Sequence, residues 1–276
     1  MVCTDMGVEF AVMAPPFASN QVGLPAPDLP PAKNNLLDVA SRGPSGERWE
    51  RGGGFQEFAC LEGFVQSPAC PPADLSDPQT CQPSAYFSPV LLEMSISWDT
   101  LTFPDAKKAA LEALDRGTSK LLEAEVELGA SAAAAVPAIL NPKLSDAPAL
   151  GAPATPDAAI GMAQDYIYRG DGTGAVHATG GAGTLLMSYE TAVRARGGLD
   201  DTDSGDIVTR FGRWPVVIGN FTPGIVYGVP GLIDVYLDEI EVVDTFERPA
   251  NEMIISAQRL ALVTFHTCAM VQVPLA

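Results

Sequence analysis

The sequence predicts an α+β fold, because one long helix pattern lies between stretches with the patterns of β-strands. Residues 103–128 carry the only long, unambiguous helix pattern of the chain. Directly before them, residues 86–102 alternate apolar and polar side chains with period two, which is typical of a half-buried strand. Residues 251–273 are apolar and rich in β-forming types, with few breakers. Helices packed against a mixed sheet are therefore expected.

Matching start and stop signals bound the helix pattern. Pro104 and Asp105 suit the first turn, and Gly129 stands where a left-handed C-terminal stop is expected. Gly117 costs about 1 kcal/mol of helix propensity, so packing must hold the helix straight. One face of the helix is expected to hold residues three or four positions apart: Lys107, Leu111, Leu114, Thr118, Leu121, Glu125 and Leu128. The four leucines among them predict a narrow apolar stripe, flanked by Ala110 and Leu122.

Composition indicates a globular chain with much extended or irregular backbone. The chain has 276 residues, including 26 Gly and 24 Pro, which suits one large domain or two small ones. Its net charge of −18 opposes direct binding to a phosphate backbone. Residues 1–10 lack the basic start of a signal peptide, and no apolar run approaches the length of a membrane span. We expect a soluble protein made and used in a cytoplasm.

Residues 1–47 predict an extended N-terminal arm. Prolines punctuate them, fix φ and favour extended backbone, and little periodicity is present. Two interpretations stay open, an arm that lies along other surfaces and a disordered linker. Leu36, Leu37 and Val39 predict one docking point.

Residues 48–85 predict a projecting ribbon. They combine a triple glycine with aromatic and cysteine residues, followed by a segment rich in Pro and Asp. The aromatic side chains are too apolar for a solvated loop, so we expect the ribbon to contact a neighbouring subunit. The interface candidates are Trp49, Phe55, Phe58 and Phe64.

The second half of the chain alternates helix and strand patterns. A helix is expected at 156–169 and a short strand at 175–178. After a polar loop at 197–206, strand-like runs follow at 207–221 and 232–273. The buried side of the helix is predicted to hold Ile160, Ala163 and Ile167.

A further helix is expected at 180–196, with Thr179 as its N-cap. Its buried face is predicted to comprise Leu185, Leu186, Tyr189 and Val193.

The sequence predicts neither an enzyme nor a cofactor site. The glycine-rich turn at 170–174 follows a helix and precedes a strand, the reverse of the order in a phosphate-binding loop. His177 and His266 are interpreted as structural residues. No pair of carboxylates stands out as a catalytic dyad. A solvated loop tip is favoured over a calcium site for Asp200, Asp201, Asp203 and Asp206.

The five cysteines include no Cys-x-x-Cys pair. Reduced or buried thiols in a cytosolic protein are the favoured interpretation. The alternative is a zinc site that requires the ribbon to fold back, with four ligands: Cys60, Cys70, Cys81 and Cys268.

This order of parts resembles the major capsid protein of tailed bacteriophages, the Hong Kong 97-type fold, in the versions found in phages of actinobacteria. The resemblance covers about residues 50–276. AVHATGGAGTLLMSYETAVRAR is similar to the family's strand and following helix, and IVTRFGRWPVVIGNF to its Gly-containing hairpin. The closing NEMIISAQRLALVTFHTCAMVQVPLA is similar to the family's final strands.

The resemblance implies five parts. They are an N-terminal arm at 1–47, an E-loop with its return strand at 48–98, the spine helix of a P domain at 99–130, an A domain at 131–235, and C-terminal strands, mainly of the P domain, at 236–276.

The resemblance also implies a structural protein rather than an enzyme. The expected role is a self-assembling subunit that forms pentamers and hexamers of an icosahedral shell around double-stranded DNA, without sequence-specific binding. The subunit would be assembled in the host cytoplasm and reside in the virion, with other capsid, portal, scaffold or decoration proteins as further candidate partners and no membrane. The alternatives are an encapsulin-like nanocompartment shell protein and a tail or decoration protein.

Overall fold

The structure is a computed structural model, and its described residues all belong to one compact unit within residues 32–276. The described residues are 33–42, 53–56, 62–63, 84–98, 103–129, 141–151, 154–169, 176–177, 182–247 and 252–276.

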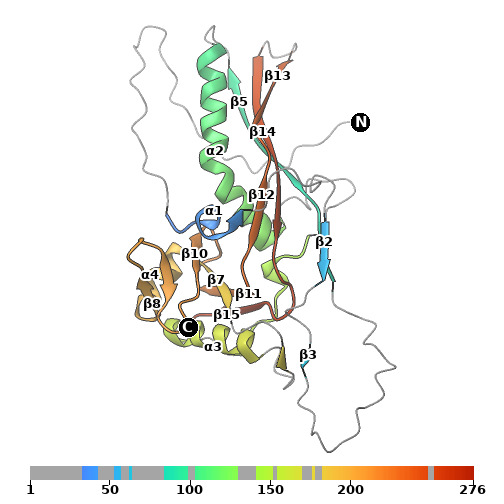
Figure 1. The fold of residues 1–276 in the computed structure, drawn as a ribbon. Coiled ribbons are helices and arrows are strands. Elements are labelled where there is room, and N and C mark those ends of the chain that lie inside the picture. The colour runs from blue at the N-terminus through green and yellow to red at the C-terminus, as the bar shows by residue number, and fades with distance from the viewer. Residues whose placement is uncertain are drawn as a thin grey trace, which may run out of the picture. The chain divides into compact units, whose positions relative to one another are not determined.

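The first sheet is built around the long strand β14 (Glu252–Thr264). It pairs in antiparallel fashion with β5 (Val90–Trp98), β12 (Asp234–Leu237) and β13 (Glu241–Glu247). Strand β1 (Ser41–Arg42) runs parallel to β12. Helix α2 lies along this sheet beside β5 and β14 (Figure 1).

The period-two pattern of β5 has the predicted consequence. Leu92 is buried and Met94 and Ile96 pack against the core, whereas Glu93 and Ser95 are exposed. The predicted strand at 86–102 is divided, because β4 (Ser84–Phe87) is a separate strand that pairs with β2 (Gly53–Gln56).

Helix α2 spans Phe103–Leu128, as predicted. Gly129 follows with a φ of 64°, and its N–H donates to the carbonyl of Glu125 at 2.8 Å. The buried face is rotated from the predicted leucine stripe toward its flanks, since Leu128 is exposed and Leu111 and Leu121 are only half-buried, whereas Ala110 and Leu122 are fully buried. Small alanines let the sheet approach closely along an i, i+4 line, so the fully buried apolar residues are Ala106, Ala110, Leu114, Leu122 and Val126.

Gly117 is part of that contact. A Cβ built on Gly117 would lie 2.5 Å from the Cε of Met94 on β5. The missing side chain therefore gives Met94 its place between helix and sheet.

The second sheet has the strand order β10 (Val216–Gly219), β7 (Gly183–Ser188), β11 (Ile225–Pro230), β15 (Val271–Pro274). Strands β10 and β7 are parallel, and the other two pairs are antiparallel. Helix α3 (Pro156–Arg169) packs against this sheet, as Figure 1 shows. Its buried residues include the three that were predicted: Ile160, Ala163 and Ile167.

The predicted helix at 180–196 is wrong for most of its length. Residues 183–188 form β7, and only α4 (Tyr189–Arg194) is helical, with Ser188 rather than Thr179 as its N-cap. Every residue of β7 is buried, so apolar and polar side chains do not alternate along it, and periodicity does not separate its short apolar run at 185–187 from a buried helix. Leu185 and Leu186 are buried in the strand, but Tyr189 and Val193 are exposed.

Shorter elements complete the described chain. They are α1 (Leu36–Val39), the pair β3 (Glu62–Gly63) and β6 (Val176–His177), the hairpin of β8 (Leu199–Asp201) and β9 (Ile207–Thr209), and the single 3-10 turns η4 (Leu144–Asp146) and η5 (Arg196–Gly198).

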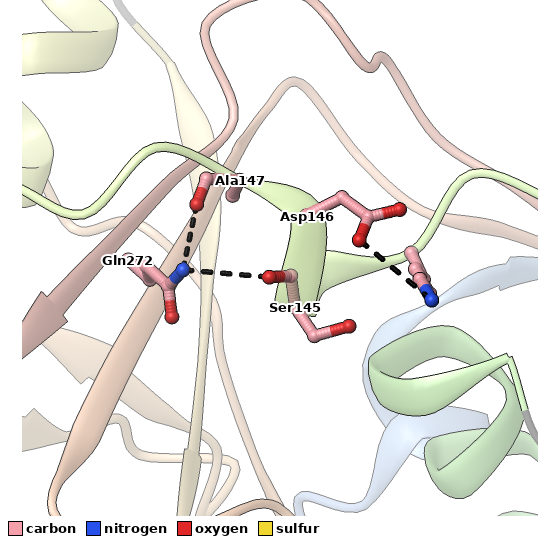
Figure 2. A network of polar contacts seen from close by, with 5 residues as sticks. Ser145, Asp146, Ala147 and Gln272 are labelled. Carbon is pink, nitrogen blue, oxygen red and sulfur yellow. Dashed lines mark hydrogen bonds and ion pairs between the residues drawn. The ribbon is translucent and has the colours of Figure 1, made fainter.

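Strand β15 carries a side-chain link to the η4 segment. The amide Nε2 of Gln272 donates to the carbonyl oxygen of Ala147 at 2.6 Å and to that of Ser145 at 3.5 Å. Figure 2 shows this contact beside the ion pair of Asp146 with Lys143 at 3.7 Å. The link holds the η4 segment against the second sheet.

We expect Leu122→Ala to lower the free energy of unfolding by about 2–5 kcal/mol, because it leaves a cavity in the core under α2. The matched control is Leu128→Ala on the same helix, whose side chain is 55% exposed and which should change stability by less than about 0.5 kcal/mol. Urea denaturation of the isolated subunit measures both. Equal losses would mean that the leucine stripe, and not the rotated face, is the buried one.

Candidate functional site

The last two turns of α2 carry buried glutamates at three alternate positions: Glu123, Glu125 and Glu127. Residues i and i+4 share one side of a helix, so Glu123 and Glu127 point the same way and Glu125 points away from both. Burying carboxylates is unfavourable unless donors surround them. Each of the three accepts hydrogen bonds from a segment that is distant in the sequence.

Glu123 connects three segments. Its Oε2 accepts from the backbone N–H of Asn220 at 2.7 Å, and its Oε1 accepts from the hydroxyl of Ser119 at 2.9 Å and the N–H of Leu36 at 3.4 Å. Burial raises the pKa of this carboxyl above 4.5, although the three hydrogen bonds and the charge of Lys120 oppose the shift.

Gly219 makes the approach to Glu123 feasible. A Cβ on Gly219 would lie 2.5 Å from both carboxylate oxygens of Glu123. The end of β10 can therefore lie directly on the carboxylate only because this residue has no side chain.

Glu127, one helical turn after Glu123, holds the same segment between β10 and β11. Its Oε1 accepts from the N–H of Thr222 and from the hydroxyl of Tyr227 on β11, both at 2.7 Å. Burial, and then the Glu127 carboxylate, raise the pKa of Tyr227. Two carboxylates of α2 thus fix residues 220–222, which join β10 to β11.

Glu125 acts on the opposite side of the helix. Its Oε1 accepts from the side-chain amide of Asn141 at 3.1 Å. The same Asn141 accepts from the N–H of Ser88 at 2.7 Å and donates to the carbonyl of Ser88 at 2.9 Å. Asn141 thereby joins α2 to the turn between β4 and β5. We call the contacts of Glu123, Glu125 and Glu127 the glutamate joint.

The N-terminal segment 33–42 docks across both sheets. Asn34 has a φ of 62°, its Oδ1 accepts from the N–H of Ile207 at 2.8 Å, and its carbonyl accepts from the N–H of Ile218 at 2.7 Å. Leu36 is fully buried and Leu37 and Val39 pack against the core, which confirms the predicted docking point.

Most of the predicted interface residues lie outside the described part of the chain. This holds for Trp49, Phe58 and Phe64. Phe55 lies on β2, opposite Ala85 of β4, and only its backbone is described. The four residues are therefore not brought together by anything that the structure describes.

Other apolar side chains reach the surface in the described residues. Sequence reasoning missed them because a strand or helix pattern assigned each to a buried side or to none. The large exposed ones are Tyr86, Leu91, Leu128, Tyr168, Tyr189, Val193, Phe211, Leu232 and Val243.

The acidic loop and the two histidines do not form a metal site in the described part of the chain. Asp201, Asp203 and Asp206 are exposed at or beside the tip of the β8–β9 hairpin, and Asp200 is half-buried and pairs with Arg210 at 3.3 Å. His266 is half-buried, and the side chain of His177 lies outside the described residues. Within the described ranges, no group of three or more His, Cys, Asp or Glu could hold a metal ion. No helix among the described residues has the length and apolarity needed to cross a membrane.

Cys268 forms a disulfide bond. The expectation of reduced thiols is wrong for this residue, because a disulfide can join positions far apart in the sequence and cysteine spacing does not reveal it. The other four cysteines lie outside the described residues.

The fold is similar to solved structures of virus-like assemblies. The capsid of an empty GTA particle, computed with C5 symmetry, matches over 94% of this chain and 95% of that chain, with a TM-score of 0.56 and 9% identity. The structure of Gordonia phage Cozz matches over 87% of this chain and 86% of that chain, with a TM-score of 0.52 and 11% identity. The structure of Mycobacterium phage Bobi matches over 94% of each chain, with a TM-score of 0.51 and 13% identity.

No family model and no curated protein matches the sequence. The structural likeness nevertheless extends over nearly the whole of both chains. The chain therefore has the α+β, Hong Kong 97-like major capsid fold that its sequence resembles.

The raised pKa of Glu123 has a defined effect on stability. Between the unfolded value of 4.5 and the raised folded value, the native state binds more protons than the unfolded state. The stability contributed by this group is therefore fully present below the unfolded value and is lost as the pH rises through the folded value.

Glu123→Gln should remove this dependence and, by placing an amide against backbone donors, lower stability by about 1–3 kcal/mol. The measurement is urea denaturation of wild type and variant from acid to neutral pH. The stability difference, wild type minus variant, should decrease as the pH rises. Glu112→Gln, on the exposed side of α2, controls for the loss of one negative charge. A difference that is flat or that grows with pH would contradict the assignment.

Proposed function

We propose that this chain is a major capsid subunit that assembles, through pentamers and hexamers, into an icosahedral shell around double-stranded DNA. The observation that carries the proposal is the likeness to the GTA capsid over 94% of this chain and 95% of the other. Function then resides in surfaces between subunits rather than in a catalytic site.

The two-stranded elements support this proposal. Among the described strands, β2 pairs with β4 alone and β3 with β6 alone. Isolated two-stranded ribbons are marginally stable in water. Ala85 and Phe87 anchor β4 to the core of the same chain, and contacts with neighbouring subunits would supply packing for the rest of each ribbon.

The charge of the chain supports enclosure of DNA without tight binding. At −18, with 16 Lys plus Arg against 34 Asp plus Glu, the subunit repels a phosphate backbone. A shell wall of this kind contains its genome without holding it.

Within this proposal the parts of the chain take the roles that the resemblance implies. The arm would be 1–47, the E-loop 48–98, the P domain 99–130 with most of 236–276, and the A domain 131–235. The packing of α2 on β5 and β14, and of α3 on the second sheet, supports this division. The last strand, β15, pairs with β11 and so returns the chain to the second sheet.

The test is the size and content of purified particles. The recombinant full chain should sediment as particles, and electron microscopy should show closed shells. Native particles should contain DNA, whereas a co-purifying enzyme would identify a nanocompartment instead. A stable monomer under assembly conditions, without particles, would refute the proposal.

We further propose that Trp49, Phe55, Phe58 and Phe64 contact a neighbouring subunit. Replacing the three phenylalanines together with Ser should impair assembly, because interface aromatics carry much of the binding free energy. Circular dichroism and thermal melting of the isolated subunit should be unchanged. A variant that no longer folds as a monomer would show that these residues belong to an intramolecular core.

A further inference from the structure

The turn between β9 and β10 displays an aromatic side chain between two arginines. We call residues 210–213, Arg-Phe-Gly-Arg, the RFGR turn. Phe211 is 79% exposed, more than any other large apolar side chain among the described residues. Exposure of a single apolar residue is common, but aromatic and arginine residues together are enriched where proteins meet.

Hydrogen bonds of Thr209 and Gln164 hold the backbone of the RFGR turn in place. The Thr209 hydroxyl accepts from Gln164 Nε2 and from the N–H of Trp214, both at 3.0 Å, and donates to the carbonyl of Phe211 at 2.7 Å. Gln164, on α3, also donates to that carbonyl at 2.7 Å. Thr209 and Trp214 are buried. Phe211 is therefore presented on a fixed support, which reduces the ordering cost of a contact.

Arg213 occupies a backbone conformation that glycine would adopt more easily. Its φ is 52°, a region that non-glycine residues enter at a cost. Its side chain is exposed and makes no ion pair within the described part of the chain. The other arginine, Arg210, pairs with Asp200 through an exposed contact at 3.3 Å. Nothing in the fold thus explains a cation at position 213.

We propose that the RFGR turn docks onto an acidic surface of a second copy of this chain. The inference rests on the proposed function, in which copies must meet. Charge selects the occupant, because Asp plus Glu outnumber Lys plus Arg by 34 to 16 and a second copy offers mainly negative surface. Phe211 supplies apolar area at the centre of the contact, and Arg213 supplies attraction at its rim.

The same charge sets the symmetry of the contact. Two RFGR turns meeting across a twofold axis would bring arginine against arginine, which is unfavourable. The turn must therefore meet a different surface of its neighbour, which makes the contact heterologous. Heterologous contacts form rings where the rotation between neighbours closes, and rings are the arrangement that capsomers require.

The experiment measures assembly of the full chain by sedimentation and electron microscopy, with thermal melting of the isolated subunit. Phe211→Ser should weaken association at least about tenfold. Arg213→Gly should weaken association and reduce its sensitivity to salt, while the melting temperature stays equal or rises because the backbone strain is relieved. Leu232→Ser is the matched control, since it also removes an exposed apolar side chain, and should assemble like wild type.

Three results would overturn the inference. In the first, wild type, Phe211→Ser and Arg213→Gly assemble alike, which leaves the proposed function intact. In the second, Phe211→Ser loses no more than Leu232→Ser. In the third, Arg213→Gly assembles normally but loses binding to a fluorescent DNA duplex, which would assign the turn to nucleic acid. A wild-type chain that forms no particles would instead remove the proposed function together with this inference.

Discussion

The glutamate joint is the interaction on which the arrangement of the described fold depends. One apolar core joins the first sheet and α2 to one side of the second sheet, and another lies between the second sheet and α3. Apolar contact is not directional, however, and would tolerate several angles between the two sheets. Two buried carboxylates of α2 instead require particular backbone N–H groups, those of Asn220 and Thr222, at 2.7 Å. Separating either pair would remove one backbone donor from a buried carboxylate, at a cost of about 1–3 kcal/mol. The joint therefore specifies one relation between α2 and the second sheet.

The joint also explains why the N-terminal segment is an ordered part of the subunit. Glu123 accepts a hydrogen bond from the N–H of Leu36. Asn34 accepts hydrogen bonds from the N–H groups of Ile207 on β9 and Ile218 on β10. Residues 33–42 thus cross from the second sheet to β12 of the first.

The sequence could predict elements with local signals and could not predict contacts between distant residues. Helix α2 was predicted to the residue because Pro104 and Gly129 mark its ends, and α3 because its apolar residues have helical spacing. Strand β7 was taken for a helix because burial on both faces removes the alternation that marks a strand. The roles of Glu123 and Gly219 arise from a carboxylate and a backbone 96 positions apart, which no pattern in either neighbourhood encodes. Phe211 was missed because its flanking residues form strands, and the Gly-Arg turn beside it was the only local sign.

A subunit with this composition has an electrostatic difficulty in any assembly. Copies that each carry a charge of −18 repel one another, and the repulsion is long-ranged at low salt. Association must then come from apolar contacts large enough to exceed the repulsion, and from the few places where cations face outward. Added salt weakens both the general repulsion and the local attraction, so the two effects on assembly have opposite signs.

The local attraction of a cation can exceed the general repulsion only if the cation is held in a fixed position. A mobile arginine loses conformational entropy on pairing and so gains little net free energy from a single acidic neighbour. The hydrogen bonds of Thr209 and Gln164 meet that condition for the RFGR turn, and they depend on α3 being packed against the second sheet.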